Sequence, residues 1–182
     1  MTRKEYLALD PRMEYCKPWT KAWFMDWLLQ SEQYHIRSFV KALRSEEYYQ
    51  CIHPNKLKLY RWKRRKNKLG VRLGFFIPAG CFGPDLKIWH YGSVIVNPES
   101  RIGSGCDIHG NCCIGSNGRT QDSPVIGNNV NLGQNCQIIG GIKVADGVKV
   151  GAGAVVIKDV MVNGATVVGI PAKIIAHSVT NE

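Results

Sequence analysis

A repeat of six residues fills the second half of the chain and limits its fold more strictly than any other sequence feature. Aliphatic residues recur at nine successive positions spaced six apart: Ile126, Leu132, Ile138, Val144, Val150, Val156, Val162, Val168 and Ile174. Upstream, the same spacing links Phe76, Phe82 and Ile88, and then Val96, Ile102, Ile108 and Ile114. A fixed period of this kind indicates a stack of similar structural units.

Such a period predicts short flat strands joined by tight corners. Each strand has one large inward residue and, four positions later, a small one, as at Val130 and Ala154. Three such strands would close a triangular coil, and the coils would stack at about 4.8 Å, the spacing of paired strands. Cys106, Cys112 and Cys136 fall on the small inward position, which explains them as free buried thiols.

The chain has two parts that differ in charge. Residues 1–75 hold 17 Lys and Arg against 7 Asp and Glu, whereas residues 76–182 hold 7 of each. We expect a basic helical region over residues 1–70, the repeat domain over residues 71–176 and a tail over residues 177–182. The fold class is therefore mainly β, with an α-helical N-terminal region.

Helical spacing of apolar residues supports the assignment of the first part. Ile36, Phe39, Val40 and Leu43 lie on one helical face, with Ser31 as the N-cap. Trp19, Trp23 and Trp27 recur every four residues after Pro18, a residue suited to the first turn of a helix. We expect this tryptophan stripe to be a buried packing seam rather than a ligand platform.

A strongly basic stretch, Asn55 to Gly70, precedes the repeat. It holds eight Lys and Arg, interleaved with apolar residues such as Leu57 and Trp62. This pattern fits a solvated helix face, and it also fits contact with an anionic membrane surface, a phosphorylated substrate or an acidic polymer. Nucleic acid is least favoured, because no recognised nucleic-acid motif accompanies the charges.

No apolar run in the chain approaches the length of about 20 residues that a helix needs to cross a bilayer. Its first residues lack the apolar stretch of a secretory signal. The seven cysteines are odd in number and do not form the paired CxxC grid of a zinc site. We therefore expect a cytoplasmic protein or one from an equivalent reducing compartment.

Two stretches give the repeat a family likeness: Trp89 to His109, "WHYGSVIVNPESRIGSGCDIH", and Gly151 to Ile175, "GAGAVVIKDVMVNGATVVGIPAKII". They resemble the hexapeptide-repeat acyltransferases, whose domain is a left-handed parallel β-helix. The hand is implied by this resemblance alone, since crossovers between parallel strands are normally right-handed. Within the family, the chain is similar to serine acetyltransferases and still closer to the O-acetyltransferases of bacterial polysaccharide gene clusters.

The resemblance implies acetyl transfer from acetyl-CoA to a hydroxyl group, without a metal. It implies a homotrimer, with a dimer of trimers left open, and an active site in each groove between neighbouring β-helices. CoA would be held by backbone and side-chain groups of the later coils. The matching residues are Gly133, Gly151, Ala152, Lys158 and Lys173.

The spacing slips where the first histidine of the repeat stands. Ile88 and Val96 are eight residues apart, so the segment that holds His90 has two extra residues and should push a side chain out of the stack. His90 matches the catalytic histidine of serine acetyltransferase-like sequences and would act as general base, since imidazole titrates near neutral pH. His109 follows the inward Ile108, so it should point outward as a second catalytic candidate.

The acceptor site departs from the serine acetyltransferase pattern at three positions. Trp89 stands where an Asp precedes the catalytic histidine, Phe75 where a carboxylate orients it, and Ser123 where a second histidine lies in a loop. We therefore expect a sugar or polysaccharide precursor as acceptor, with serine as the alternative. The expected acceptor-binding residues are Trp89, Tyr91, Asp107, Arg119 and Asp122. Asp85, Glu99 and Asp107 are the candidates for orienting His90.

Three further expectations complete the sequence-based hypothesis. Residues 116–123 contain no aliphatic residue and should leave the coil as a loop. A lipid-linked sugar acceptor would suit a basic helix at the inner face of a membrane. Two non-acyl functions stay open: a scaffold, and a zinc hydratase, which would need three converging histidines where the repeats supply only His90 and His109.

Overall fold

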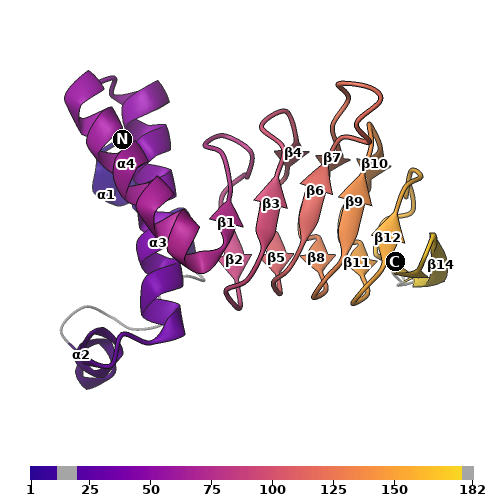
Figure 1. The fold of residues 1–182 in the computed structure, drawn as a ribbon, viewed down its shortest axis with the longest axis horizontal. Coiled ribbons are helices and arrows are strands. Elements are labelled where there is room, and N and C mark those ends of the chain that lie inside the picture. Colours follow the sequence, from indigo (N-terminus) through magenta and orange to yellow (C-terminus); the bar gives the residue numbers. More distant parts are fainter. Residues whose placement is uncertain (12–19, 178–182) are drawn as a thin grey trace.

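The computed structural model describes residues 1–11 and 20–177. A helical region stands at one end of a prism of stacked strands (Figure 1). Its helices are α1 (Arg3–Leu7), α2 (Lys21–Leu28), α3 (Glu32–Glu47), the single π-helical turn η2 (Tyr48–Ile52) and α4 (Lys56–Leu73). The basic helix thus runs three residues beyond Gly70 and ends at Gly74, which adopts the left-handed conformation.

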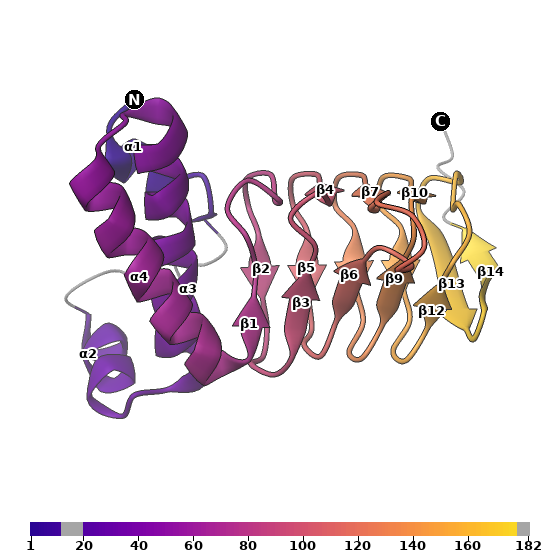
Figure 2. The same cartoon turned by 45° about the horizontal axis from the view of Figure 1, so that its top comes forward.

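The prism has short strands throughout. In chain order they are β1 (Phe75–Phe76), β2 (Lys87–Ile88), β3 (Val94–Val96), β4 (Arg101–Ile102), β5 (Asp107–Ile108), β6 (Cys113–Gly115), β7 (Val125–Ile126), β8 (Asn131–Leu132), β9 (Gln137–Ile139), β10 (Lys143–Val144), β11 (Lys149–Val150), β12 (Val155–Val156), β13 (Ala165–Gly169) and β14 (Ala172–His177). Up to β13, successive strands belong to different sheets, and from β3 to β12 the chain advances by one coil every three strands (Figure 2).

Three sheets form the sides of the prism. Sheet 1 has the order β1-β3-β6-β9-β12, sheet 2 the order β4-β7-β10, and sheet 3 the order β2-β5-β8-β11-β13-β14. All pairings are parallel except that of β13 with β14, which form an antiparallel end. The predicted triangular coil of stacked parallel strands is therefore confirmed.

The interior of the prism follows the predicted period over its central coils. The large inward positions from Phe82 to Val156 are buried, and so are the small inward residues Cys106, Cys112 and Cys136. The period is wrong at both ends. Phe76 is exposed, because Phe75 and Ile77 on either side of it point inward, and beyond β12 the buried residues are Val160, Ala165 and Val167 instead of Val162 and Val168.

The end of the period has a geometric cause. Val160 pairs in parallel with Val144, and Val167 pairs in parallel with Val150, so the steps between inward residues after Val156 are four and then seven residues instead of six. The last strand, β14, pairs antiparallel with β13. Ile174 is consequently exposed on β14. The hexapeptide pattern in the sequence therefore continues for three repeats after the inward residues have left that spacing.

The helical region packs through α3. Ser31 caps this helix by accepting the Tyr34 N–H, and Ile36, Phe39, Val40 and Leu43 are buried, as predicted. The predicted tryptophan seam is wrong: α2 has no buried residue, Trp23 is half-buried and Trp27 is 43% exposed, because α2 extends away from the coil (Figure 1). Pro18 and Trp19 lie outside the described residues.

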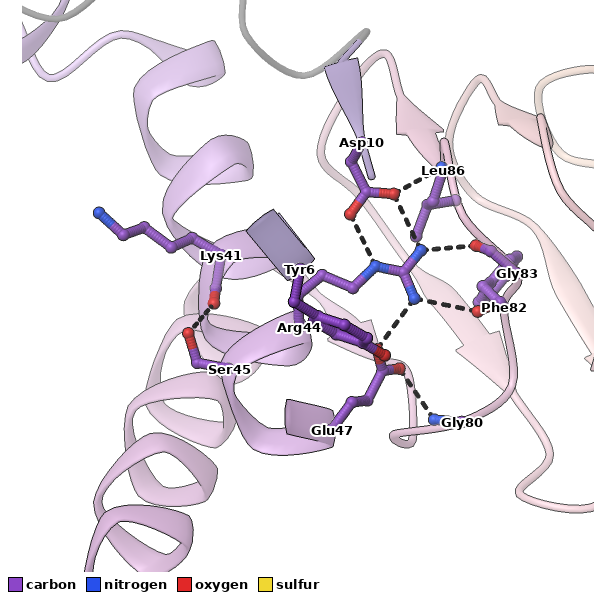
Figure 3. Close-up of polar contacts among 10 residues, drawn as sticks. All are labelled: Tyr6, Asp10, Lys41, Arg44, Ser45, Glu47, Gly80, Phe82, Gly83 and Leu86. Atoms are coloured by element: carbon purple, nitrogen blue, oxygen red, sulfur yellow. Dashed lines mark hydrogen bonds and ion pairs between the residues drawn. The ribbon is translucent and has the colours of Figure 1, made fainter. Parts of the chain in front are cut away.

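A buried charge cluster joins α3 to the first coils (Figure 3). Arg44 binds both carboxylate oxygens of Asp10, at 2.7 and 2.9 Å, and one oxygen of Glu47 at 2.9 Å. Its guanidinium also donates to the carbonyls of Phe82 and Gly83. These partners raise the pKa of Arg44 despite its burial. Because five acceptors saturate the guanidinium, the helices are held to the coil at one fixed position.

Helix α4 turns its cationic side outward. Leu57, Tyr60 and Val71 are exposed among the lysines and arginines, whereas Lys66 points inward and pairs with Glu46 at 2.9 Å. Trp62 is half-buried, with the guanidinium of Arg3 5.1 Å from its ring centre. Within the described residues, no helix combines the length and the apolar character that a membrane crossing requires.

Candidate active site

The corner between β2 and β3 is longer than its counterpart in the next coil. Ile88 pairs with Ile108 and Val96 pairs with Ile114, so eight residues span what six span one coil later. The predicted two-residue extension is therefore confirmed. Gly92 has φ 127° there, and a Cβ on it would come within 2.5 Å of Asn111 Oδ1, so the corner requires glycine at this position.

The long corner carries His90 outside the prism, with 63% of its side chain exposed. Its Nδ1 lies 3.3 Å from Oε2 of Glu32, in the first turn of α3. The other oxygen of Glu32 accepts the Tyr91 N–H at 2.8 Å. A carboxylate from the helical region therefore holds the histidine of the coil.

Sequence reasoning missed this carboxylate. It named Asp85, Glu99 and Asp107 as orienting candidates, all within the repeat, whereas the structure places Glu32 against the imidazole. Glu32 is 58 residues away from His90 in the chain, and only the docking of α3 on the first coils brings the two together. The available signal was the Ser31 cap, which places Glu32 in an exposed first turn without indicating what it faces.

Trp89 and His109 form a stacked pair beside His90. Their ring centres are 5.6 Å apart and their planes differ by 9°. Lys87 Nζ lies 3.3 Å from the centre of the Trp89 ring, a cation–π contact. Because the strands are in register, Trp89 and His109 occupy equivalent positions in successive coils. His109 points outward as predicted. Its ring packs on the indole of Trp89, whereas Nδ1 of His90 contacts the carboxylate of Glu32.

The edge that holds His90 continues along the prism. Gly133 follows β8 and Gly151 follows β11, so both stand at the same corner as His109, between sheets 3 and 1. Ala152 lies beside Gly151. A Cβ on Gly133 would lie 2.6 Å from the Val150 carbonyl, and one on Gly151 would lie 2.7 Å from Val168 Cγ1. The neighbouring coil therefore leaves no room for a side chain at either glycine, and the N–H groups of both donate to carbonyls of that coil.

Asp107 lies on β5 in register with Lys87, two residues before His109, whereas three other predicted site residues lie elsewhere. Residues 116–124 leave the coil as a loop between β6 and β7, as predicted, at the corner between sheets 1 and 2 (Figure 1). This loop carries Arg119 and Asp122, and Asp122 packs against Gly141. Lys158 follows β12 at the same corner, and Lys173 lies on β14. Within one chain, Arg119, Asp122 and Lys158 stand at a different corner from His90, whereas Lys173 pairs with Val168 beside Gly151, on the His90 edge.

Two buried thiols lie beneath the His90 edge. Cys136 donates to Cys112 over 3.7 Å, a hydrogen bond that lowers the pKa of Cys112 and raises that of Cys136. Both side chains are only 1% exposed, so neither is placed to act as a nucleophile. Among the described residues, His, Cys, Asp and Glu side chains form no group of three or more that could hold a metal.

Comparison with known proteins agrees with the repeat assignment. Residues 123–158 match the family model "Bacterial transferase hexapeptide (six repeats)". The chain is 32% identical over 103 residues to a serine acetyltransferase of Synechococcus elongatus, which covers 56% of this chain and 42% of the relative. It is 30% identical over 149 residues to one from Buchnera aphidicola subsp. Schizaphis graminum, covering 75% and 54%. The chain thus spans about half the length of the curated relatives it matches.

Solved structures share the architecture. The soybean serine acetyltransferase apoenzyme superposes with a TM-score of 0.72 at 22% identity, over 95% of this chain and 69% of that one. A serine acetyltransferase from Brucella abortus strain S19 in complex with coenzyme A gives a TM-score of 0.68 at 22% identity, over 97% and 68%. The left-handed parallel β-helix with an N-terminal helical region, expected from the repeat, is therefore the fold of this chain.

Proposed function

We propose that this chain, whose coil carries hexapeptide repeats of the bacterial transferase family, is an acetyl-CoA-dependent O-acetyltransferase with His90 as its general base. The observation that carries the proposal is the position of His90. It projects from a corner two residues longer than that of the next coil, on the edge that continues through Gly133 and Gly151. The coenzyme A complex of a structural neighbour supports the choice of donor.

The proposed reaction is a direct transfer. A ring nitrogen of His90 takes the proton of the acceptor hydroxyl as that oxygen attacks the thioester carbonyl of acetyl-CoA. The tetrahedral intermediate then collapses, the C–S bond breaks, and the CoA sulfur leaves with the proton that His90 had taken up. The acetyl ester and free CoA thiol are the products, so each bond and proton is balanced without a covalent acyl-enzyme. Nearby backbone N–H groups would stabilise the oxyanion.

L-Serine is the acceptor that the comparisons favour, because the curated relatives and the solved structures are serine acetyltransferases. They support it better than the sugar acceptor expected from the sequence. The sugar hydroxyl stays a second candidate because of Trp89. Trp89 supplies no carboxylate to pair with the amino group of serine, and Ser123 likewise supplies no charge.

The proposal includes a homotrimer. Arg119, Asp122 and Lys158 stand at the corner between sheets 1 and 2, whereas His90 stands at the corner between sheets 3 and 1. A closed ring of heterologous contacts would bring one corner of each copy to the other corner of its neighbour. The acceptor and CoA phosphates could then meet both sets of residues. Light scattering after gel filtration measures the assembly, and a monomeric active enzyme would contradict this part.

We also propose that α4 contacts an anionic membrane surface. The helix carries eight lysines and arginines between Asn55 and Gly70, and its outward side exposes Leu57, Tyr60 and Val71 among them. Near an anionic membrane each cation contributes about 1 kcal/mol. Co-sedimentation with phosphatidylserine vesicles at low salt tests the contact, with phosphatidylcholine vesicles as control. Equal sedimentation with the two kinds of vesicle would remove it.

Thiol release from acetyl-CoA tests the enzymatic proposal. We expect turnover with L-serine, or with a sugar from an acceptor panel, and a fall of about 10²- to 10⁴-fold in His90→Ala. His53→Ala, in the helical region, is the matched control and should retain activity. A His90→Ala protein that turns over at the wild-type rate would refute the proposal, and turnover confined to one acceptor class would decide between serine and sugar.

A further inference from the structure

We propose that Glu32 is a positioning residue for His90: it fixes the imidazole in the tautomer that leaves Nε2 free to take the acceptor proton. The inference rests on the proposed function, because it assigns Glu32 a role in the same site. It departs from the expectation that the orienting carboxylate lies in the repeat, since Glu32 belongs to the first turn of α3.

The contact geometry supports a clamp rather than a chance approach. Glu32 uses its two oxygens on successive residues of the long corner, with Oε2 3.3 Å from His90 Nδ1 and Oε1 accepting the Tyr91 N–H at 2.8 Å. The second bond is made to backbone and so fixes the carboxylate relative to the corner itself. His90 Nδ1 is therefore presented with an oxygen in a defined position.

Neighbouring contacts hold the first turn of α3 in place. Gln33 donates its side-chain amide to the Trp89 carbonyl at 2.6 Å, so Glu32 and Gln33 together bind three consecutive residues of the corner. Ser31 donates to Asp26 at 2.9 Å, and Asp26 forms an ion pair with Arg37 further along α3. Glu32 therefore projects from a braced helix end rather than from a free loop.

The chemical consequence concerns the second nitrogen of the ring. A carboxylate accepts hydrogen bonds and has none to donate when ionised, so the neutral imidazole must present Nδ1–H to Glu32. The lone pair then lies on Nε2, on the opposite side of the ring from Glu32. When Nε2 takes the acceptor proton, the positive ring lies beside a negative carboxylate, which stabilises it.

Exposure fits such a role. The His90 side chain is 63% exposed and that of Glu32 is 30% exposed, so the pair is open to a substrate on the histidine side and partly shielded on the carboxylate side. A purely structural brace would explain the Tyr91 contact equally well. The experiment must therefore separate tautomer control from bracing.

Glu32→Gln makes that separation. Glutamine can still accept the Tyr91 N–H through its oxygen, which preserves the brace, but it would turn an NH₂ toward His90 Nδ1 and favour the opposite tautomer. We expect kcat to fall roughly 10- to 100-fold with the KM for acetyl-CoA unchanged. Glu32→Asp keeps the charge and should retain more activity than Glu32→Gln. Glu5→Gln, at an exposed carboxylate of α1, is the matched control and should match the wild type.

A spectroscopic measurement gives a readout independent of turnover. Nitrogen-15 shifts of the imidazole, assigned by loss of signals in His90→Ala, report which nitrogen carries the proton. We expect the Nδ1–H tautomer in the wild-type protein and a shift toward Nε2–H in Glu32→Gln. A wild-type ring protonated at Nε2 would overturn the inference, whatever the activities are.

The two proposals fail in different ways. If His90→Ala is inactive while Glu32→Gln keeps wild-type kcat, the role of Glu32 is refuted and the proposed function stands. If His90→Ala is active, the proposed function falls. We further expect the double variant to be no slower than His90→Ala alone, since Glu32 acts only through His90. Additive losses would overturn the inference, and thermal melting confirms that each variant is folded.

Discussion

The coil and the helical region are stabilised by different kinds of contact. In the coil, each strand repeats the same parallel pairing and places an aliphatic side chain in the interior, so one coil resembles the next. The helical region has no repeat. It meets the coil through an apolar contact, with Phe39 against Phe75, and through polar contacts that single residues make. Arg44 alone joins Asp10, Glu47 and two carbonyls of the first coil.

This difference shows that the candidate site forms where the repeat is interrupted and where the helical region contacts it. A repeat supplies a long straight edge, and its interruption at the β2–β3 corner exposes His90. The group that holds His90 comes from the non-repeating region, as Glu32. The coil thus sets where His90 lies along the prism, while the helical region supplies a contact to it that is not repeated in other coils.

The largest effect should follow from breaking the junction at Arg44. Arg44→Met leaves Asp10 and Glu47 buried without their cation, and removing one partner of a buried charge cluster destabilises by about 3–5 kcal/mol. Urea unfolding followed by circular dichroism measures the loss. Arg64→Met, on the outward side of α4, is the control and should change stability by less than about 0.5 kcal/mol. Equal losses in the two variants would contradict the special role of the junction.

A somewhat smaller effect is expected inside the coil. Ile138 is fully buried in β9, and Ile138→Ala should destabilise by about 3 kcal/mol through lost burial and the cavity left behind. Ile157→Ala, at a half-exposed position just after β12, is the matched control and should lose much less. The same urea series compares both with Arg44→Met. If Ile138→Ala exceeded it, the stack rather than the junction would be the more sensitive region.

The smallest effect concerns pH at the junction. Burial and the nearby charge of Glu47 raise the pKa of Tyr6 to about 12, and its hydroxyl donates to Glu47 over 3.3 Å. An unfolded tyrosine has a pKa of about 10. Protonated Tyr6 therefore stabilises the folded protein below that pH, and this stabilisation is lost as the pH rises toward about 12. The difference in melting temperature between wild type and Tyr6→Phe should therefore shrink between pH 9.5 and pH 11.5, on the order of a few degrees.

The control for this pH series is Tyr60→Phe, which alters an exposed ring on α4. Its melting temperature should follow the wild type at each pH. A Tyr6→Phe protein that also follows the wild type at every pH would show that the hydrogen bond from Tyr6 to Glu47 contributes no pH-dependent stability.

Sequence predicted the coil well because the signal is local and repeated. Each inward residue from Phe82 to Val156 could be located by counting, and the eight-residue step from Ile88 to Val96 marked the corner that holds His90. Counting in steps of six failed to locate the inward residues after Val156. After Val156 the inward residues are Val160 and Val167, at steps of four and seven, so the six-residue spacing no longer places Val162 and Val168 inward. Ile174 lies on the antiparallel strand β14 and is exposed.

The contacts of the helical region could not be counted in this way. Ile36 and Leu43 were predictable from helical spacing, but the partners of Arg44 and Glu32 depend on how α3 meets the first coils. Likewise, the Trp23 and Trp27 spacing predicted a helix correctly and its burial incorrectly, since amphipathic spacing does not specify a neighbour.

Glu32 and Arg44 stand near opposite ends of one helix of sixteen residues. Helix α3 therefore links the Arg44 cluster to the carboxylate at His90. The number of residues between Glu32 and Arg44 fixes the direction of one side chain relative to the other around the helix axis. Deleting a single residue between them would turn one end relative to the other by about 100°. With every contacting side chain still present in the chain, the docked helix would then direct Glu32 away from the imidazole, so the length of α3 is itself a determinant of the site.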